Sequence, residues 1–338
     1  MHVLITGHTG FKGSWMTLML ERLGHTVSGV ALEPPASGIF RGADVESSLH
    51  TDARHDIRDS AWLSQFVRNL SPDLIVHMAA QPLVRESYRN PRETYEVNVM
   101  GTLNVLEAAA GCRVEPAVLI VTSDKVYRND GRVQGYLEGD ALGGHDPYSA
   151  SKAMADLLAQ SWAASFGLPT IAIARAGNVI GGGDVSQDRL LPDLIRSFAR
   201  EEPAVIRNPL AVRPWQHVLD CLTGYLAVIS ALMDANHSGA WNVGPSPENF
   251  RTVGEVADLA SESWGGSATW VTNREAEAVH EAALLTLNAA RARELLGWSE
   301  TFTLVGAVEL TVEWERARLR GESLRQLSLD QIDRALRS

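Results

Sequence analysis

Short aliphatic runs alternate with amphipathic stretches over the first 180 residues of the chain. The aliphatic runs are continuous, which is typical of strands buried on both faces of a sheet. The stretches between them have the helical spacing of apolar residues. Strands are expected at 2–6, 25–32, 73–79, 117–122 and 170–176, and helices at about 14–23, 60–70, 93–110 and 148–165. This order predicts an α/β fold built on a doubly wound parallel sheet.

The regular alternation of aliphatic and amphipathic stretches ends after residue 180. The sequence GGGD (181–184) is expected to be a flexible break, and a region rich in proline and arginine follows it. Further helices are expected at about 215–234, 252–264, 288–296 and 303–320. The residues after 180 therefore predict a smaller mixed α/β lobe, with about 205–245 returning to the first domain. The last residues, from ERARLRG onward, are expected to form a solvated terminal helix.

Composition and charge limit the class of protein. The chain has 338 residues, of which 45% are hydrophobic and 21% are charged, as in ordinary globular proteins. The net charge of −11 argues against binding to nucleic acid or to an anionic membrane surface. An anionic small-molecule substrate remains open, because a few arginines can form a local positive pocket.

Targeting and metal-binding signals are not found in the sequence. The two cysteines, Cys112 and Cys221, are far apart and are expected to be reduced thiols. No secretory signal and no apolar run of membrane-spanning length is found, so we expect a cytoplasmic protein. The ten histidines show no ligand spacing, and we expect no metal site.

A glycine-rich loop follows the first expected strand. In TGHTGFKG, Gly7, Gly10 and Gly13 stand in GxxGxxG spacing before a helix. Glycines at this place allow the backbone to approach a pyrophosphate, and the helix N-terminus supplies N–H groups to it. Such a pattern alone fits a plain tight turn equally well. Its position at the first strand–helix junction favours a dinucleotide site and a Rossmann domain.

The second strand lacks the acidic residue that commonly binds the ribose of NAD. Ala31 stands at the expected place, and Glu33 follows two residues later. Since no arginine is nearby in the sequence to receive a 2′-phosphate, NAD is favoured over NADP. Asp56 and Ile57 stand further along, in the segment HDIRD, where adenine could be met; a helix cap after a solvated loop explains them nearly as well.

The segment PYSASK places Tyr148 and Lys152 four residues apart at the start of a helix, on one face. The neighbouring ammonium is expected to lower the pKa of the phenol and make it usable as a base. This spacing occurs by chance in many helices. Together with the glycine loop and Ser123 at a strand's carboxyl end, it favours a catalytic site.

Asp124 and Lys125 follow Ser123 directly in the segment VTSDKVY. In isolation, a solvated acid–base pair at a strand end is the more common situation. In a continuing strand the two side chains would point to opposite faces, so the strand is expected to end near Thr122. An acid–base role also requires burial to outweigh their mutual attraction, because attraction stabilises both charged forms.

Several segments resemble the extended short-chain dehydrogenase/reductase superfamily, and within it most of all the CDP-glucose 4,6-dehydratases. They are TGHTGFKGSW, AAQPLVRESY, NVMGT, TSDK, LGGHDPYSASK, ARAGNVIGGGD, DRLLPD, RNPLAVRPWQHV and WNVGP. The resemblance extends from residue 2 to about 313. It implies an NAD-binding Rossmann domain over 1–180 and a substrate-binding lobe over 181–338. It further implies a homodimer or a dimer of dimers, formed through the helices at about 93–112 and 148–165.

The resemblance also implies a reaction. Tyr148 would take the proton of the sugar C4 hydroxyl, Ser123 would hydrogen-bond the same oxygen, and Lys152 would hold the nicotinamide ribose. Asp124 (acid) and Lys125 (base) would then remove water across C5 and C6, where relatives acting on dTDP-glucose carry an Asp–Glu pair. Returning the hydride to C6 gives a 4-keto-6-deoxy sugar.

Binding residues are implied in the same way. NAD would be bound by Gly7, Gly10, Phe11, Gly13, Asp56, Ile57, Ala79, Ala80, Asn98, Thr122, Tyr148 and Lys152. The nucleotide sugar would be bound at its diphosphate by Asn178, Arg213 and Arg189, and at its sugar by Gln81 and Arg85. The guanidinium fork suits a diphosphate because it gives two aligned, charge-assisted hydrogen bonds.

Three alternatives stay open. A nucleotide-sugar 4-epimerase would need Tyr148, Lys152 and NAD but no elimination pair. Val126 stands where the family often has cysteine, which leaves a dehydratase acting on another nucleotide hexose open. A non-catalytic NAD-binding regulator would be expected to lose the tyrosine or the lysine, and this chain keeps both.

Overall fold

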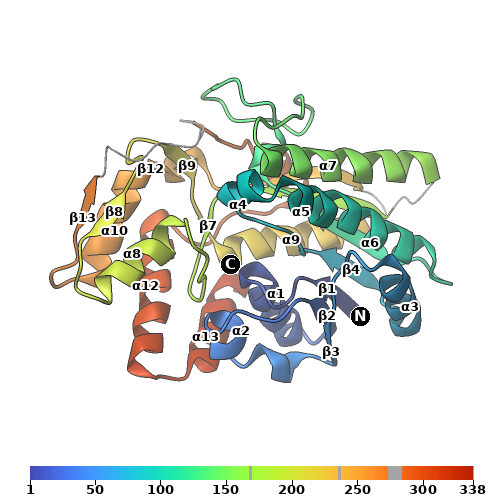
Figure 1. Ribbon diagram of the computed structural model, residues 1–338, viewed down its shortest axis with the longest axis horizontal. Helices are drawn as coiled ribbons and strands as arrows, with labels where there is room; N and C mark the ends of the chain where they lie inside the picture. The colour runs from blue at the N-terminus through green and yellow to red at the C-terminus, as the bar shows by residue number, and fades with distance from the viewer. Residues whose placement is uncertain (167–169, 235–236, 273–283, 338) are drawn as a thin grey trace.

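A computed structural model describes residues 1–166, 170–234, 237–272 and 284–337 of the chain. Within these ranges seven parallel strands form one sheet in the order β11-β6-β5-β4-β1-β2-β3 (Figure 1). They are β1 (His2–Thr6), β2 (Thr26–Ala31), β3 (Thr51–Arg54), β4 (Leu74–His77), β5 (Ala117–Val121), β6 (Ile171–Ala176) and β11 (Gly239–Val243). The chain reverses its direction of winding between β1 and β4, which opens a crevice at the strands' carboxyl ends. The predicted doubly wound parallel sheet is confirmed.

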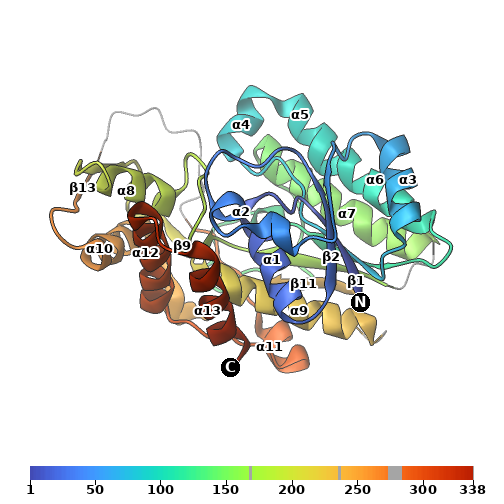
Figure 2. The same ribbon diagram turned by 90° about the horizontal axis from the view of Figure 1, so that it is seen from below.

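Helices cover both faces of this sheet (Figure 2). One face carries α1 (Phe11–Arg22), α2 (Ile39–Gly42), α9 (Val218–Met233), α11 (Ala290–Leu296) and α13 (Leu324–Leu336). The other carries α3 (Ser60–Leu70), α4 (Val84–Arg89), α5 (Pro91–Tyr95), α6 (Gly101–Ala110) and α7 (Pro147–Phe166). A single π-helical turn, Glu96–Met100, joins α5 to α6. The two layers bury the aliphatic strands on both sides, as their continuous apolar sequence requires.

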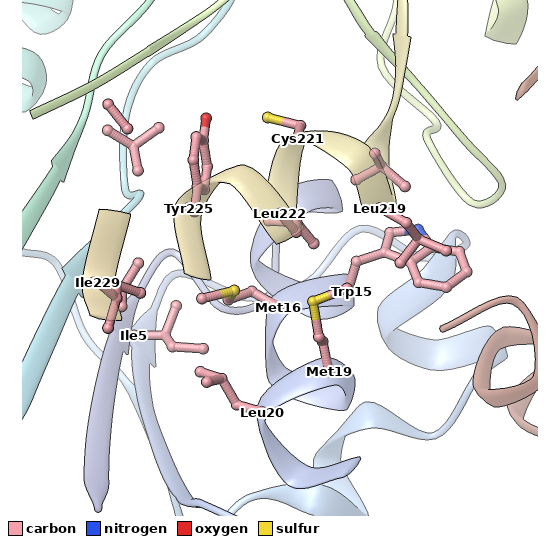
Figure 3. Packing of buried hydrophobic residues seen from close by; sticks show 14 of the residues in the cluster. Ile5, Trp15, Met16, Met19, Leu20, Leu219, Cys221, Leu222, Tyr225 and Ile229 are labelled. Atoms are coloured by element: carbon pink, nitrogen blue, oxygen red, sulfur yellow. The ribbon is translucent and has the colours of Figure 1, made fainter. Parts of the chain in front are cut away.

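The packing of α1 against α9 forms the centre of the core on one face of the sheet (Figure 3). Trp15 and Met16 of α1 and Leu222 of α9 are fully buried. Burial of such side chains contributes about 1.5–3 kcal/mol each. The hydroxyl of Tyr225 points away from this apolar layer, toward the carboxyl ends of the strands, and accepts a hydrogen bond from Lys12 Nζ at 3.0 Å. The core therefore fixes α1, whose N-terminus belongs to the glycine-rich loop.

Two strands of the sheet were not expected from the sequence. β3 is an edge strand with the polar sequence TDAR, and all four of its residues are half-buried. β11 pairs with β6 at the opposite edge, although its sequence GAWNV contains glycine and asparagine. Neither strand has the continuous aliphatic pattern by which the central strands are recognised. The domain boundary at residue 180 stays a prediction.

A smaller mixed lobe lies beside the sheet, as expected. It contains α8 (Leu190–Phe198), α10 (Val253–Trp264) and α12 (Leu304–Arg320), which share a separate apolar cluster. Three strand pairs complete it: β7 (Val179–Ile180) with β10 (Gln216–His217), β8 (Ala204–Ile206) with β13 (Trp270–Thr272), and β9 (Val212–Pro214) with β12 (Phe250–Thr252). Across the described ranges, helices of membrane-spanning length and apolarity do not occur.

The GGGD segment is tightly packed, which corrects the expectation of a flexible break. Its residues are buried, and a Cβ on Gly182 would lie 2.2 Å from Trp314. The Gly182 carbonyl accepts from Trp15 Nε1 at 3.0 Å, and the Gly183 N–H donates to Glu315 Oε1 at 2.8 Å. Here glycine is required because a helix approaches the backbone closely.

The C-terminal segment also differs from the expected solvated helix. Gly321, with φ of 70°, ends α12, and α13 folds back onto α1 and α9. Ile332 and Ala335 are buried in the same core as α1. Many charged residues of this segment, such as Arg320 and Glu322, are exposed, and they obscure the apolar stripe when composition alone is considered.

Candidate active site

A cavity of about 340 Å³ opens where the carboxyl ends of the strands face the lobe. It is lined from the sheet side by the turn after β5 and the start of α7, and from the lobe by α8 and β8. The structure brings together there twelve of the residues singled out in the sequence: Phe11, Ala80, Arg85, Thr122, Ser123, Asp124, Lys125, Tyr148, Lys152, Asn178, Arg189 and Arg213. Gly7, Gly10, Gly13, Asp56, Ile57, Ala79, Gln81 and Asn98 lie outside its lining.

The acid–base pair lies on a short turn at the end of β5. The strand ends at Val121, and Asp124–Val126 forms a 3-10 turn, so the predicted bend after Thr122 is confirmed. The Ser123 hydroxyl caps this turn by accepting from the Lys125 N–H at 3.1 Å. It also donates to Asp124 Oδ1 at 2.8 Å. The turn allows two successive side chains to line one cavity, which an extended strand would prevent.

Asp124 is a buried carboxyl group with an unsatisfied oxygen. Its exposed fraction is 2%, and Oδ2 has no hydrogen-bond partner among the residues that the structure describes. Burial raises the pKa of Asp124, although the charges of Lys125 and Arg213 and the Ser123 hydroxyl act in the opposite direction. Desolvation therefore outweighs the attraction of Lys125, as an acid role requires. Lys125 itself is half-buried and lines the cavity.

Tyr148 and Lys152 lie one turn apart at the start of α7. The Tyr148 N–H donates to Ser87 Oγ at 3.1 Å, which fixes the start of the helix. Lys152 Nζ donates to the carbonyl of Val121, the last residue of β5, at 3.1 Å. The i, i+4 spacing thus places both side chains against the end of the strand that carries the acid–base turn.

The pKa values of this pair differ from the expectation. Burial raises the pKa of Tyr148 to about 12, although the hydrogen bond with Ser123 acts to lower it. Burial also lowers the pKa of Lys152 to about 7, and the nearby charge of Lys12 lowers it further. The expected lowering of the tyrosine pKa was wrong for this structure, because both groups are desolvated and desolvation disfavours both charged forms.

The glycine-rich loop forms a close backbone cradle before α1. A Cβ on Gly13 would lie 2.2 Å from the Gly7 carbonyl oxygen, and one on Gly7 would lie 2.7 Å from the Ala79 nitrogen. Gly7 also has a φ of 80°. Gly10 is the N-cap of α1 and provides no side-chain acceptor, so the first-turn N–H groups remain for an external anion. The loop therefore fits the pyrophosphate of a dinucleotide.

Three other residues expected to contact the cofactor, Asp56, Ile57 and Asn98, make bonds of their own within the protein. Ile57 is buried, and its carbonyl accepts from the Asn104 side chain at 2.9 Å. Asp56 forms an ion pair with Arg58 at 2.6 Å, whose hydrogen bonds lower the pKa of Asp56. Asn98, in the π-helical turn, accepts from the Gln81 N–H at 2.8 Å and donates to Ser151 Oγ at 2.9 Å. Asn98 thus supports the backbone after β4; its direct contact with NAD stays a prediction.

The residues expected to bind the nucleotide sugar differ in their positions. Asn178, Arg213 and the half-buried Arg189 line the cavity, and Arg189 Nη1 pairs with Asp184 Oδ2 at 2.8 Å. Arg85 also lines it, from α4. The Gln81 side chain instead hydrogen-bonds within its own loop, to the Leu83 backbone and to Thr94 Oγ1. A sugar contact by Gln81 stays a prediction.

Sequence reasoning missed five charged residues that line the cavity: Lys12, Asp184, Asp188, Asp193 and Arg207. Asp188, with φ of 59°, accepts from Arg207 at 2.9 Å and lies 3.3 Å from Arg85, so it joins the lobe to α4. Lys12 was treated only as a position within the glycine-rich motif. A charged residue in the first turn of a buried helix could itself have indicated a functional side chain. Nothing in the local sequence marks Asp188 or Arg207. Within the described ranges, no three His, Cys, Asp or Glu side chains are grouped to hold a metal ion.

Comparison with known proteins gives a family match and close relatives. Residues 3–244 match the NAD dependent epimerase/dehydratase family. The CDP-glucose 4,6-dehydratase of Salmonella typhimurium is 42% identical over 333 residues, covering 95% of this chain and 92% of that protein.

Two solved structures share the fold. The dTDP-glucose 4,6-dehydratase of Bacillus anthracis in complex with NAD has a TM-score of 0.80 at 21% identity, covering 97% of this chain and 99% of its own. The UDP-glucose-4-epimerase of Stenotrophomonas maltophila has a TM-score of 0.84 at 23% identity, covering 95% and 99%. Because a dehydratase and an epimerase fit equally well, the fold alone does not distinguish the two reactions.

Proposed function

The chain belongs to the NAD dependent epimerase/dehydratase family, and from this premise we propose that it catalyses the NAD-dependent 4,6-dehydration of CDP-glucose to CDP-4-keto-6-deoxyglucose. One observation carries the proposal: the turn with Asp124 and Lys125 lines the same cavity as Tyr148 and Lys152. An epimerase needs only the second pair. The 42% identity to a CDP-glucose 4,6-dehydratase supports the choice of reaction and of nucleotide.

NAD is the proposed cofactor, and the glycine cradle supports it. Gly7, Gly10 and Gly13 leave the backbone open to a pyrophosphate, and Phe11 and Thr122 line the cavity beyond the cradle. When bound, NAD accepts a hydride from C4 of the sugar and returns it to C6. The residues of the chain bind it, orient the sugar and move the protons.

Tyr148 is proposed to take the proton of the C4 hydroxyl. Ser123 binds the same oxygen; its hydroxyl already hydrogen-bonds Asp124 and acts on the pKa of Tyr148. Burial raises the pKa of Tyr148 to about 12, so its phenolate, once formed, is basic enough to accept a proton from an alcohol. Lys152, one turn further along α7, is proposed to stabilise that phenolate when it carries its own proton, and burial lowers its pKa to about 7.

Asp124 and Lys125 are proposed to remove water from C5 and C6. The ketone at C4 makes the C5 proton acidic, and the Lys125 amine takes it. Asp124 gives its proton to the departing C6 hydroxyl, which leaves as water, and the protonated Lys125 gives the proton back to C5 when C6 accepts the hydride. Burial raises the pKa of Asp124, which keeps the acid protonated at a higher pH than an exposed aspartate.

The nucleotide diphosphate is proposed to lie against Arg213, Arg189 and Asn178, with Arg85 nearer the sugar. All four line the cavity, and a diphosphate pairs well with forked guanidinium groups. Arg213 is buried, and its positive charge already acts on Asp124. The same arginine can therefore place the diphosphate at a fixed distance from the reacting carbons.

A homodimer is proposed through α6 and α7. Met100, at the end of the π-helical turn before α6, and Met154 and Leu157 of α7 are about half exposed. Met100 and Met154 line a mainly apolar hollow of about 400 Å³, together with Tyr95 and Val99. Such a patch on helices is typical of a subunit interface. A cytoplasmic location is proposed as well, since Cys112 and Cys221 are free thiols.

The function is tested by incubating the protein and NAD separately with the CDP, dTDP, UDP and GDP forms of glucose. NMR of the products should show a 4-keto-6-deoxy sugar, formed fastest from CDP-glucose. A C4-inverted sugar would show a 4-epimerase instead, and NAD binding without turnover would show a regulator. If another nucleotide sugar is converted fastest, the proposed reaction stands and the proposed substrate is wrong.

The role of Lys125 is tested by Lys125→Ala. The variant should reduce bound NAD on addition of CDP-glucose but form the dehydrated product about 10²–10⁴-fold more slowly, because only the C5 base is lost. Arg128→Ala, which removes an exposed cation that does not line the cavity, is the matched control and should keep elimination within several-fold of the wild type. Elimination by Lys125→Ala at the wild-type rate would contradict the assignment.

A further inference from the structure

A buried polar network lies directly behind the acid–base turn and contains none of the residues assigned above to proton transfer. At its centre Arg175 of β6 and Asp156 of α7 are 1% and 0% exposed. Arg175 Nε donates to Asp156 Oδ2 at 2.8 Å and Nη2 donates to Oδ1 at 2.7 Å. The Gln160 side chain donates to Oδ1 at 2.7 Å. This bidentate geometry holds the two elements in one relative position.

The network reaches the turn on both of its sides. Before it, Thr122 Oγ1 donates to Asp156 Oδ2 at 3.2 Å. After it, the Tyr127 hydroxyl accepts from Arg175 Nη1 at 2.9 Å and donates to Asn242 Oδ1 of β11 at 2.7 Å. Burial raises the pKa of Tyr127 to about 12, so the phenol keeps the proton that it donates.

The turn itself has few bonds of its own. The Val126 N–H donates to the Ser123 carbonyl at 3.3 Å, and the Lys125 N–H donates to Ser123 Oγ at 3.1 Å. The first of these is long for a hydrogen bond between such groups. The Val126 carbonyl also accepts from the Gly143 N–H at 2.8 Å. A turn of three residues has few bonds of its own, so the residues that flank it, here Thr122 and Tyr127, also determine its position.

The same network is tied to the other catalytic pair. Asp156 follows Lys152 by four residues and Tyr148 by eight, so all three lie along one face of α7. Lys152 also bonds the Val121 carbonyl at the end of β5. The helix face that carries the oxidation pair is therefore bonded directly to the residues before the turn, and through Arg175 to Tyr127 after it.

We propose that the Arg175–Asp156 pair, acting through Thr122 and Tyr127, positions the Asp124–Lys125 turn relative to Tyr148 and Lys152, so that oxidation at C4 and elimination across C5 and C6 act on one bound sugar. Arg175, Asp156 and Tyr127 are positioning residues and need not touch the substrate. The inference rests on the proposed function. It differs from a purely structural role in one respect: weakening the network on the Tyr127 side slows elimination while oxidation continues.

The test is Tyr127→Phe, which removes one hydroxyl and keeps the ring and the Arg175–Asp156 pair. Product formation from CDP-glucose should slow about 10- to 100-fold, since small misplacements of reacting groups have effects of this size. KM should stay within about twofold. The absorbance of reduced cofactor after mixing should appear at the wild-type rate and persist longer, because oxidation is intact and elimination is delayed.

Tyr136→Phe is the matched control. Tyr136 stacks on Tyr127 with ring centroids 5.1 Å apart, but its hydroxyl bonds Asn129 and Asp130, outside the network. This variant should eliminate at the wild-type rate. Arg175→Lys is a second test, because it keeps the buried charge and loses the fork; it should delay elimination more than oxidation as well.

The outcomes separate the inference from the proposed function. Elimination by Tyr127→Phe at the wild-type rate would overturn the inference, and so would equal slowing of oxidation and elimination in a variant whose thermal unfolding and cofactor binding are normal. If Tyr127→Phe does not fold, Arg175→Lys decides by the same two rates. A wild-type protein that forms no 4-keto-6-deoxy sugar contradicts the proposed function itself.

Discussion

Asp124, in the short turn after β5, and Asp156, on α7 behind that turn, are both buried carboxyl groups but differ in how their hydrogen-bonding capacity is satisfied. Asp156 accepts hydrogen bonds from Arg175, Gln160 and Thr122, and both of its oxygens are engaged. Asp124 accepts from Ser123 on one oxygen only, and its second oxygen has no partner in the described part of the chain. Buried polar groups are usually satisfied, so an unsatisfied carboxyl oxygen on a residue that lines the cavity fits a group that meets the substrate.

The contrast shows how one small region can hold both a structural and a reactive carboxyl. Asp156 is surrounded by donors and fixes α7 to β6. Asp124 faces a cavity, and burial raises its pKa because too few donors offset the loss of water. The first is expected to matter most for stability, and the second for activity.

The largest expected effect comes from Asp124→Asn. The amide keeps the shape of the side chain but cannot give a proton to the departing hydroxyl, so formation of the dehydrated sugar should fall about 10²–10⁴-fold. The free energy of unfolding should be equal to the wild type or higher, because a buried ionisable group is replaced by a neutral one. NMR of the product and urea unfolding measure the two effects, and activity within tenfold of the wild type would remove Asp124 from the mechanism.

Asp156→Asn should instead affect the free energy of unfolding more than the activity. It leaves the buried Arg175 without its charge partner, and breaking a buried pair in this way costs about 3–5 kcal/mol. Urea unfolding followed by circular dichroism should show the loss. A decrease below about 1 kcal/mol would mean that the pair does not hold α7 to β6, and the contrast between the two carboxyls would disappear.

A third buried carboxyl group, Asp220 of α9, is expected to make the stability of the protein depend on pH. Burial raises its pKa to about 7, although the Thr301 N–H donates to Oδ1 at 2.7 Å. Between pH 3.8 and about 7 the folded protein thus binds this proton more tightly than the unfolded chain does, so this group lowers stability as pH rises through that range. Asp220→Asn should flatten the pH dependence of the unfolding midpoint. An unchanged slope between pH 4 and 7 would show that Asp220 titrates normally.

The smallest effect is expected from Asp333→Asn at the surface. Arg22 and Asp333 form a bidentate pair at 2.7 and 2.9 Å, with distances like those of Arg175 and Asp156. Both side chains are solvated, and water screens their attraction. The unfolding midpoint should stay unchanged within error in thermal unfolding. A loss as large as that of Asp156→Asn would show that geometry, not burial, determines the value of these pairs.

Much of the fold and the site follows from local sequence patterns. The central strands are continuous aliphatic runs, and the spacing of Tyr148 and Lys152 places them together without any knowledge of tertiary structure. The turn after β5 was predicted because a strand could not aim Asp124 and Lys125 into one site. These features depend on residues close in the chain.

The features that were missed depend on contacts between distant residues. Gly182 is rigid because Trp314, far along the chain, lies against it. The pKa of Tyr148 follows its burial and not its distance to Lys152 in the helix. Asp156 and Arg175 lie on different elements, and neither carries a motif that indicates the other. Burial and long-range pairing are set by the tertiary fold, so a local pattern cannot reveal them.

The most direct test of the account is a hydrogen-transfer experiment on the wild-type protein. CDP-glucose carrying deuterium at C4 is incubated with the protein and NAD, and the product is examined by NMR. The account predicts a 4-keto-6-deoxy sugar with the deuterium at C6. Deuterium that stays at C4, in a sugar that is unchanged or inverted there, would contradict it.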